Sequence, residues 1–209
     1  MAAQSNLKNM VLCLTLVCLF CASVLAGVYA LTCEPIKAAE AGELKASIGM
    51  VLPGGGQISE PLAVDIDGTE YQYYKSEKDG SVQAYAVKSE TNGFGGKLSL
   101  MVGVLPDGTV WATRVLSHSE TPGLGAKCTT DEGFYSQFRG LGPDKALRLK
   151  KDGGDLDAIT ASTITSRAYT LAVSNAVNVV KSLQGEVLPA DAFSGASTAA
   201  ATENKEVQQ

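Results

Sequence analysis

The protein is 209 residues long, which corresponds to one ordinary domain and a further segment. Its 22 acidic and 17 basic side chains give a formal net charge of −5, which excludes a chain that binds nucleic acid by neutralising phosphates. A single histidine excludes a metal site built from several histidines, and 45% hydrophobic residues supply enough apolar material for a folded core.

The first element in the chain is an apolar run, from Met10 to Leu31, that contains no charged side chain. A run of this length crosses a bilayer as one helix, so we predict a retained transmembrane helix over these residues. Lys8 precedes the run and, by the positive-inside rule, places segment 1–9 in the cytoplasm and the rest of the chain on the other side. A signal peptide cleaved after Val28-Tyr29-Ala30 is the alternative.

The five cysteines divide into two groups. Cys13, Cys18 and Cys21 lie inside the apolar run, where we expect small apolar side chains and not a metal or redox site. Cys33 and Cys128 lie outside it, and the sequence leaves open both a disulfide in an oxidising compartment and two free thiols.

Residues 32–59 are predicted to be a linker that includes a short helix. Ala, Leu and Lys recur at helical spacing from Glu34 to Ile48, and the run Pro53-Gly54-Gly55-Gly56 then ends any regular element.

Two β-hairpins are predicted in the following segment, because apolar and β-prone residues flank two turns that each contain Asp-Gly. The paired strands are 69–75 with 81–88, around Lys78-Asp79-Gly80, and 97–105 with 109–116, around Pro106-Asp107-Gly108.

Two helices are predicted after the hairpins. Residues 130–139 form a short helix capped by Thr130 or Asp131, and residues 166–183 carry one apolar stripe that packs on the sheet. Residues 189–209 are small and polar and are predicted to be a disordered tail. The predicted fold class is therefore α+β: a single small domain over residues 60–188, with an antiparallel sheet packed by helices, preceded by one transmembrane helix.

A loop at residues 117–125, directly after the last predicted strand, is the first candidate site. Its glycines let the backbone approach a flat ligand or adopt positive φ, although such a loop is also an ordinary connection. The candidate binding residues here are Thr121, Gly123, Leu124 and Gly125.

A cluster of hydroxyl side chains at residues 157–167 is the second candidate site. It lies directly before the helix over residues 166–183, where we expect Thr165 to be an exposed residue of the helix start. One hydroxyl is explained by helix capping, whereas the cluster favours an anion site, since free amides and the helix dipole attract a phosphate there. No Gly-Lys-Ser/Thr is present, so it is not a nucleotide-binding loop of the Walker type.

These residues resemble a known family. The run from Asp157 to Thr165 resembles the flavinylation motif of the FMN-binding domain, Asp-x-x-Ser/Thr-Gly-Ala-Ser/Thr-x-Ser/Thr. Glu120 to Gly125, and Gly93 to Gly96 followed by Met101 to Val104, resemble further signatures of the same domain. The domain occurs in the G subunit of the Rnf electron-transport complex and in the C subunit of sodium-translocating NADH:quinone oxidoreductase, and the short chain is closer to the former.

The resemblance implies covalent FMN, attached to Thr165 as a phosphoester by a dedicated flavin transferase. Five further residues of the motif would contribute to the cofactor site: Asp157, Thr160, Ala161, Ser162 and Thr163. Asp157 would support the loop and not act as a general base, by bonding nearby backbone amides. The sequence departs from the family pattern where Ala161-Ser162 replaces Gly-Ala, which matters if positive φ is needed at residue 161.

The resemblance further implies an electron-carrier subunit of a membrane-bound, ion-translocating oxidoreductase of the Rnf type, which is not catalytic alone. Its partners would be the other membrane subunits and, during maturation, the flavin transferase. The protein would be a single-pass protein of the cytoplasmic membrane with its soluble domain on the outer, periplasmic face. The alternative functions are a membrane-tethered sensor that binds FMN without a covalent bond and a structural or adhesive domain without a cofactor.

Overall fold

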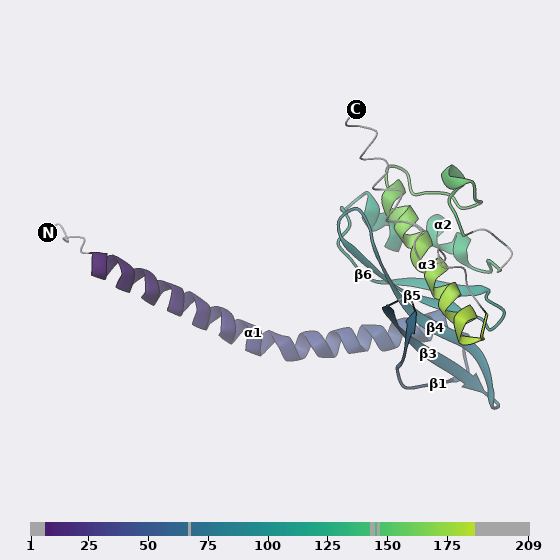
Figure 1. Ribbon diagram of the computed structural model, residues 1–209, viewed down its shortest axis with the longest axis horizontal. Helices are drawn as coiled ribbons and strands as arrows, with labels where there is room; N and C mark the ends of the chain where they lie inside the picture. Colours follow the sequence, from purple (N-terminus) through teal and green to yellow (C-terminus); the bar gives the residue numbers. More distant parts are fainter. Residues whose placement is uncertain (1–6, 67, 143–144, 146, 187–209) are drawn as a thin grey trace. The chain divides into compact units, whose positions relative to one another are not determined.

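The computed structural model describes residues 7–66, 68–142, 145 and 147–186. It divides into two compact units, residues 1–44 and 45–209, and the predicted tail at 189–209 lies outside the described residues. The helices and strands, labelled in Figure 1, are α1 (Leu7–Val51), β1 (Gln57–Ile58), β2 (Leu62–Ile66), β3 (Thr69–Lys78), β4 (Ser81–Asn92), β5 (Lys97–Val104), β6 (Val110–His118), η1 (Gly125–Thr129), α2 (Glu132–Tyr135), η2 (Ser136–Phe138), η3 (Lys150–Asp152) and α3 (Thr163–Leu183).

The first unit contains the helix α1 as far as Leu44, and this helix continues without a break through the apolar run and past Pro35. Among the described residues this is the one helix long and apolar enough to cross a membrane. Its large apolar side chains are exposed along the run, from Met10 at 60% to Leu31 at 80%. Such a continuous apolar surface is stable in a lipid environment and not in water.

The second unit contains an antiparallel sheet in the order β1-β3-β4-β5-β6, with β2 also paired to β3. The two predicted hairpins are confirmed as β3–β4 and β5–β6, while β1 and β2 fall in segments for which no strand was predicted. In the first turn, Asp79 and Gly80 both adopt positive φ, as the tight connection requires.

Alternation along the central strand β5 divides its side chains between the two faces of the sheet. Leu98, Leu100 and Val102 belong to the main core, which also contains the buried stripe of α3. Figure 1 shows α3 lying across the sheet, and the Thr91 hydroxyl of β4 donates a 3.0 Å hydrogen bond to the carbonyl of Ala168. The predicted packing of this helix on the sheet is therefore confirmed.

The end of α1 that belongs to the second unit approaches the other face of β5. Ile48 and Val51, in this end of the helix, and the following Leu52 are buried. A Cβ on Gly103 would overlap the carbonyl of Val51, so glycine is required where this helix end approaches the strand. Helices thus pack on an antiparallel sheet, and one long apolar helix precedes this sheet in the chain. The predicted α+β fold class is confirmed.

The short helical segment after the sheet also agrees with its prediction in part. The segment predicted at 130–139 is α2 followed by the single turn η2, and Asp131 is its cap, because the carboxylate accepts a 3.2 Å hydrogen bond from the amide of Phe134. Phe134, Phe138 and Tyr169 form an aromatic cluster that joins this segment to α3.

Candidate functional site

Thr165 lies inside the first turn of α3 and is buried, with 1% of its surface exposed. Its hydroxyl Oγ1 donates a 2.8 Å hydrogen bond to Oε2 of Glu120, a residue 45 positions away in the sequence. The expectation that Thr165 is an exposed residue of the helix start is therefore wrong. The helix begins at Thr163 and not at residue 166, and this earlier start turns the Thr165 side chain inward.

Glu120 is a central residue of this site that the candidate binding residues did not include. It is 5% exposed, and its Oε1 accepts a 3.4 Å hydrogen bond from the amide of Gly95. Its own amide donates to Nδ1 of His118 at 3.2 Å. A buried carboxylate needs such donors to offset the loss of water. A glutamate in a polar loop is ordinarily exposed, so only its place in the Glu120–Gly125 signature marks it in the sequence.

Glycines allow three loops to meet around the Glu120 carboxylate and the Thr165 hydroxyl. A Cβ on Gly125 would overlap Oε2 of Glu120 and come within 2.7 Å of Oγ1 of Thr165. A Cβ on Gly93 would overlap Oε1 of Glu120, and one on Gly95 would overlap the carbonyl of Ser119. The structure therefore brings together the two candidate loops and adds the loop at 93–96 between β4 and β5.

The remaining hydroxyls of the cluster have separate roles. Ser162 occupies the N-cap position of α3, but its side chain makes no capping hydrogen bond. Its carbonyl accepts a 2.9 Å hydrogen bond from Oγ of Ser166, which in turn accepts from the amide of Ile159. Oγ1 of Thr163 accepts from Nζ of Lys151 at 3.3 Å, and Thr160 is exposed. The start of α3 thus has a cation beside it and no side-chain cap at Ser162.

Ala161 adopts a φ of +61°, in the left-handed region that favours glycine. This is the residue at which the sequence departs from the glycine of the family pattern. The backbone there keeps the conformation that glycine adopts freely, although a methyl group in this region costs about 1–2 kcal/mol. The backbone is therefore strained at Ala161.

The two charged residues that flank the motif are paired away from Thr165. Oδ2 of Asp157 contacts Nζ of Lys150 at 2.7 Å, and the amide and carbonyl of Asp157 are bonded by the Gln137 side chain at 2.7 and 2.9 Å. The expectation that the Asp157 carboxylate bonds backbone amides of its own loop is therefore not met. Arg167 donates two hydrogen bonds to Asp152, at 2.8 and 3.0 Å.

The Glu120–Gly125 loop presents its backbone and one apolar side chain. The carbonyl of Thr121 accepts hydrogen bonds from the amides of Leu124 and Ala126, both at 3.2 Å, and Gly123 has a φ of +77°. Leu124 is exposed, as are Phe94 on the neighbouring glycine loop and Ile164 beside Thr165. Each of the three converging loops thus carries one large exposed apolar side chain.

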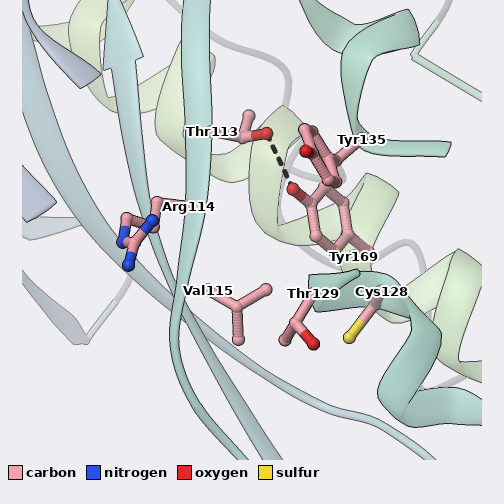
Figure 2. Close-up of a pocket in the computed structure, with 7 residues that line it drawn as sticks. All are labelled: Thr113, Arg114, Val115, Cys128, Thr129, Tyr135 and Tyr169. Atoms are coloured by element: carbon pink, nitrogen blue, oxygen red, sulfur yellow. Dashed lines mark hydrogen bonds between the residues drawn. The ribbon is translucent and has the colours of Figure 1, made fainter. Parts of the chain in front are cut away.

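A pocket of about 200 Å³ lies one helical turn along α3 from Thr165, between α3, β6 and η1. Its lining residues are Thr113, Arg114, Val115, Cys128, Thr129, Tyr135 and Tyr169. Figure 2 shows the Arg114 guanidinium on the opposite side of the β6 ribbon from Thr113 and Val115, so this cation is directed away from the pocket. The hydroxyls of Thr113 and Tyr169 lie 2.7 Å apart.

Two of the side chains that line this pocket, Cys128 and Tyr169, are neutral at physiological pH. Burial, together with the negative charge of Glu120, raises the pKa of the Cys128 thiol to about 11, and burial raises the pKa of Tyr169 as well. Cys33 and Cys128 are both free thiols. Within the described part of the chain, no group of three or more His, Cys, Asp or Glu side chains could hold a metal ion.

Tyr71, Tyr73 and Tyr74 are buried in the sheet, and the guanidinium of Arg139 lies 5.5 Å from the ring centroid of Trp111.

Known proteins share both the domain and the length of this chain. The family model of the FMN-binding domain matches residues 93–178, which contain all three converging loops. The G subunit of the proton-translocating ferredoxin:NAD(+) oxidoreductase complex of Clostridium ljungdahlii is 33% identical over 175 residues, covering 82% of this chain and 90% of that protein. The G subunit of the ion-translocating oxidoreductase complex of Methanosarcina acetivorans is 34% identical over 191 residues, covering 88% of this chain and all of that protein.

A solved structure of the C subunit of the Na(+)-translocating NADH-quinone reductase of Parabacteroides distasonis is also similar, with a TM-score of 0.48 and 23% identity over 62% of this chain and 80% of that one. The extent and identity of the sequence matches establish the family. The chain belongs to the G subunits of ion-translocating oxidoreductase complexes and contains their FMN-binding domain.

Proposed function

We propose that this protein carries FMN as a phosphoester on Thr165 and transfers electrons within a membrane-bound, ion-translocating complex of the Rnf type. The observation that carries the proposal is the position of the Thr165 hydroxyl, at the start of α3 and at the meeting point of three loops of the FMN-binding domain. FMN would supply the redox chemistry through its isoalloxazine ring, and the protein would hold and orient it.

The free amides and the positive charge at the start of α3 favour a phosphate. The first amides of a helix have no partner within the helix, and the Ser162 side chain does not cap them. Lys151 supplies a positive charge beside Thr163. Among the motif residues, Ala161 and Ser162 would shape the turn, Thr160 would border it, and Asp157 would anchor it through Lys150 and Gln137.

The surroundings also fit the rest of the cofactor. The exposed Phe94, Leu124 and Ile164 offer apolar surface to a flat ring, and the backbone of Thr121 to Gly125 would lie along it. The pocket one turn away carries four hydroxyl groups, from Thr113, Thr129, Tyr135 and Tyr169, and the one charged side chain among its lining residues, Arg114, is directed away from it. Neutral hydroxyls of this kind suit a polyol chain such as the ribityl group.

The long apolar helix would serve as a single retained anchor in the cytoplasmic membrane. Lys8 would stay on the cytoplasmic side, which places the FMN-binding domain on the outer, periplasmic face. The relatives are named as subunits of multi-subunit complexes, so we expect the partners of this chain to be the other membrane subunits, and a flavin transferase during maturation. In this role the chain is a carrier and not an enzyme by itself.

Attachment is tested by the mass of the full-length chain produced with and without a flavin transferase. We expect an increment of one FMN less water that maps to a peptide containing Thr165, with fluorescence that survives denaturation. Thr165→Ala should abolish both, Thr165→Ser should retain them, and Thr163→Ala should reduce them. An increment on another peptide, or one that persists in Thr165→Ala, would refute the assignment.

The Thr165→Ala variant needs a control for folding. Removal of the hydroxyl leaves the buried Glu120 carboxylate without one of its donors, at a cost of about 1–3 kcal/mol. The circular dichroism and thermal unfolding of the variant should therefore be measured beside its flavin content. The wild-type chain produced with the transferase could instead show no mass increment while the native protein absorbs light as FMN does. In that case FMN is bound without a covalent bond, and this proposal is refuted.

The anchor is tested by N-terminal sequencing of protein extracted from membranes. A start near Met1 is expected for a retained helix, whereas a start at Leu31 would mean that the segment is a cleaved signal peptide.

A further inference from the structure

The hydroxyl group that would be esterified is enclosed in this structure. Thr165 is 1% exposed, and its only hydroxyl hydrogen points to the carboxylate of Glu120, which is itself 5% exposed. The Glu120 carboxylate is also bonded by the amide of Gly95, so one side chain joins the loop after β6, the loop between β4 and β5, and the start of α3.

Esterification, on which this inference rests, removes the hydrogen bond. The Oγ1–H bond of Thr165 is replaced by an Oγ1–P bond. The phosphorus–oxygen bond to the leaving group of an activated flavin nucleotide breaks with its electron pair, and the hydroxyl proton is released. Oγ1 then has no hydrogen to donate to Glu120, and the phosphodiester carries one negative charge beside a carboxylate. Two like charges in a buried site repel each other strongly.

The space around Thr165 is too small for a phosphate as well. A single carbon atom added to Gly125 would overlap Oε2 of Glu120 and approach Oγ1 of Thr165 to 2.7 Å. A phosphorus atom with its oxygens is larger than this carbon, so it requires a displacement of either α3 or the loop. α3 is fixed by its buried stripe in the core, whereas the loop contains Gly123 in an open position, where an added Cβ would meet nothing within 4 Å.

We propose that Glu120 is a positioning residue of the modification site that holds the Thr165 hydroxyl only in the unmodified protein. Attachment of FMN breaks this contact and moves the Glu120–Gly125 loop away from the start of α3. The loop that lies over the hydroxyl before modification thereby becomes free to rearrange around the attached cofactor.

Hydrogen–deuterium exchange of the full-length chain in detergent compares the two states directly. We expect amides in peptides that cover residues 117–129 to exchange roughly tenfold faster or more in flavinylated protein than in protein produced without the transferase. Peptides that cover the β3–β4 hairpin should exchange equally in both and serve as the internal control. Unchanged exchange at 117–129, in protein whose mass shows one FMN on Thr165, would refute the inference without affecting the proposed function.

A second experiment needs neither FMN nor a transferase. Thr165→Asp places a carboxylate beside Glu120, and Thr165→Asn places a side chain of the same shape without the charge and with a hydrogen to donate. At pH 8 we expect residues 117–129 to exchange roughly tenfold faster in Thr165→Asp than in Thr165→Asn. Glu120→Gln, added to both variants, should remove most of this difference. Equal exchange in the two single variants, or a difference that Glu120→Gln leaves unchanged, would contradict the inference even if Thr165 carries FMN.

Discussion

Arg167 and Asp152 form a two-point ion pair, in which Nε and Nη2 of the guanidinium donate to the two carboxylate oxygens at 3.0 and 2.8 Å. This pair joins the turn η3 to the first helical turn of α3, in which Thr165 lies. A planar guanidinium that engages both oxygens fixes orientation as well as distance. The pair therefore helps to fix the position of the start of α3 relative to the preceding loop.

Loss of this pair should lower stability in a pH-dependent way. The Arg167 hydrogen bond, with the charges of Arg167, Arg148 and Lys151, lowers the pKa of Asp152 in the folded protein. Its stabilisation is therefore present above the unfolded carboxyl pKa of about 3.9 and is lost as the pH falls through the lower folded value. Asp152→Asn should reduce the free energy of unfolding at pH 7 by up to about 1 kcal/mol, since the pair is partly exposed.

Urea unfolding of Asp152→Asn and wild type at a series of pH values measures this effect. The two curves should converge at pH values below the folded pKa of Asp152. Asp155→Asn, at an exposed position three residues after Asp152, is the matched control and should change little. A constant difference at all pH values would show that the variant acts through packing and not through the charge of Asp152.

The strain at Ala161 leads to a prediction about three side chains at one position. Since φ is +61°, Ala161→Gly should raise the free energy of unfolding by about 0.5–1 kcal/mol, and Ala161→Val should lower it, because a β-branched residue tolerates this region worst. Thermal unfolding measures the stability of the three proteins, which should decrease in the order Gly, Ala, Val at position 161. Ala158→Gly, where φ is not positive, should instead destabilise.

The close approach at Gly125 can be tested by adding one methyl group. Gly125→Ala should cost about 1–3 kcal/mol of stability, because its Cβ overlaps the Glu120 carboxylate and crowds Thr165. It should also reduce FMN loading, measured as the fraction of chains with the FMN mass increment. Gly142→Ala is the matched control, since its nearest neighbour, Oγ1 of Thr109, would lie 3.9 Å from the new carbon. Equal stability of the two variants would contradict the packing described for the three loops.

Cys128 should react slowly with alkylating reagents in the folded protein. The thiolate is the nucleophile, and with a pKa of about 11 roughly one thiol in a thousand is ionised at pH 8, whereas an unfolded cysteine is ionised to roughly a quarter. The measurement is the rate of iodoacetamide labelling, followed by mass, in a chain whose other four cysteines are replaced by alanine. Labelling in the folded protein should still increase up to about pH 11, and urea should accelerate it at pH 8. A plateau near pH 9 would show that burial and Glu120 do not suppress the thiolate.

Local sequence determined much of the fold. Asp79-Gly80 and Asp107-Gly108 mark the hairpin turns because these residues tolerate the backbone angles that tight turns need, and the strands beside them follow from β-prone side chains. The period of the apolar residues in α3 predicted its packing face, and the uncharged run predicted the long apolar helix. Each of these depends on interactions between residues that are close in the chain.

Thr165 and the hydroxyl cluster could likewise be found from sequence, by their pattern and by their resemblance to a family motif. Their environment could not. The burial of Thr165, and the partner that its hydroxyl finds in Glu120, depend on a contact across 45 residues and on glycines at 93, 95 and 125 that let three loops come close enough to touch. Local propensity sets the ends of a helix only to within a few residues, and here a start three residues earlier turned an expected surface hydroxyl into a buried one. Tertiary packing alone made Glu120, an ordinary charged residue in the sequence, the partner of the candidate attachment site.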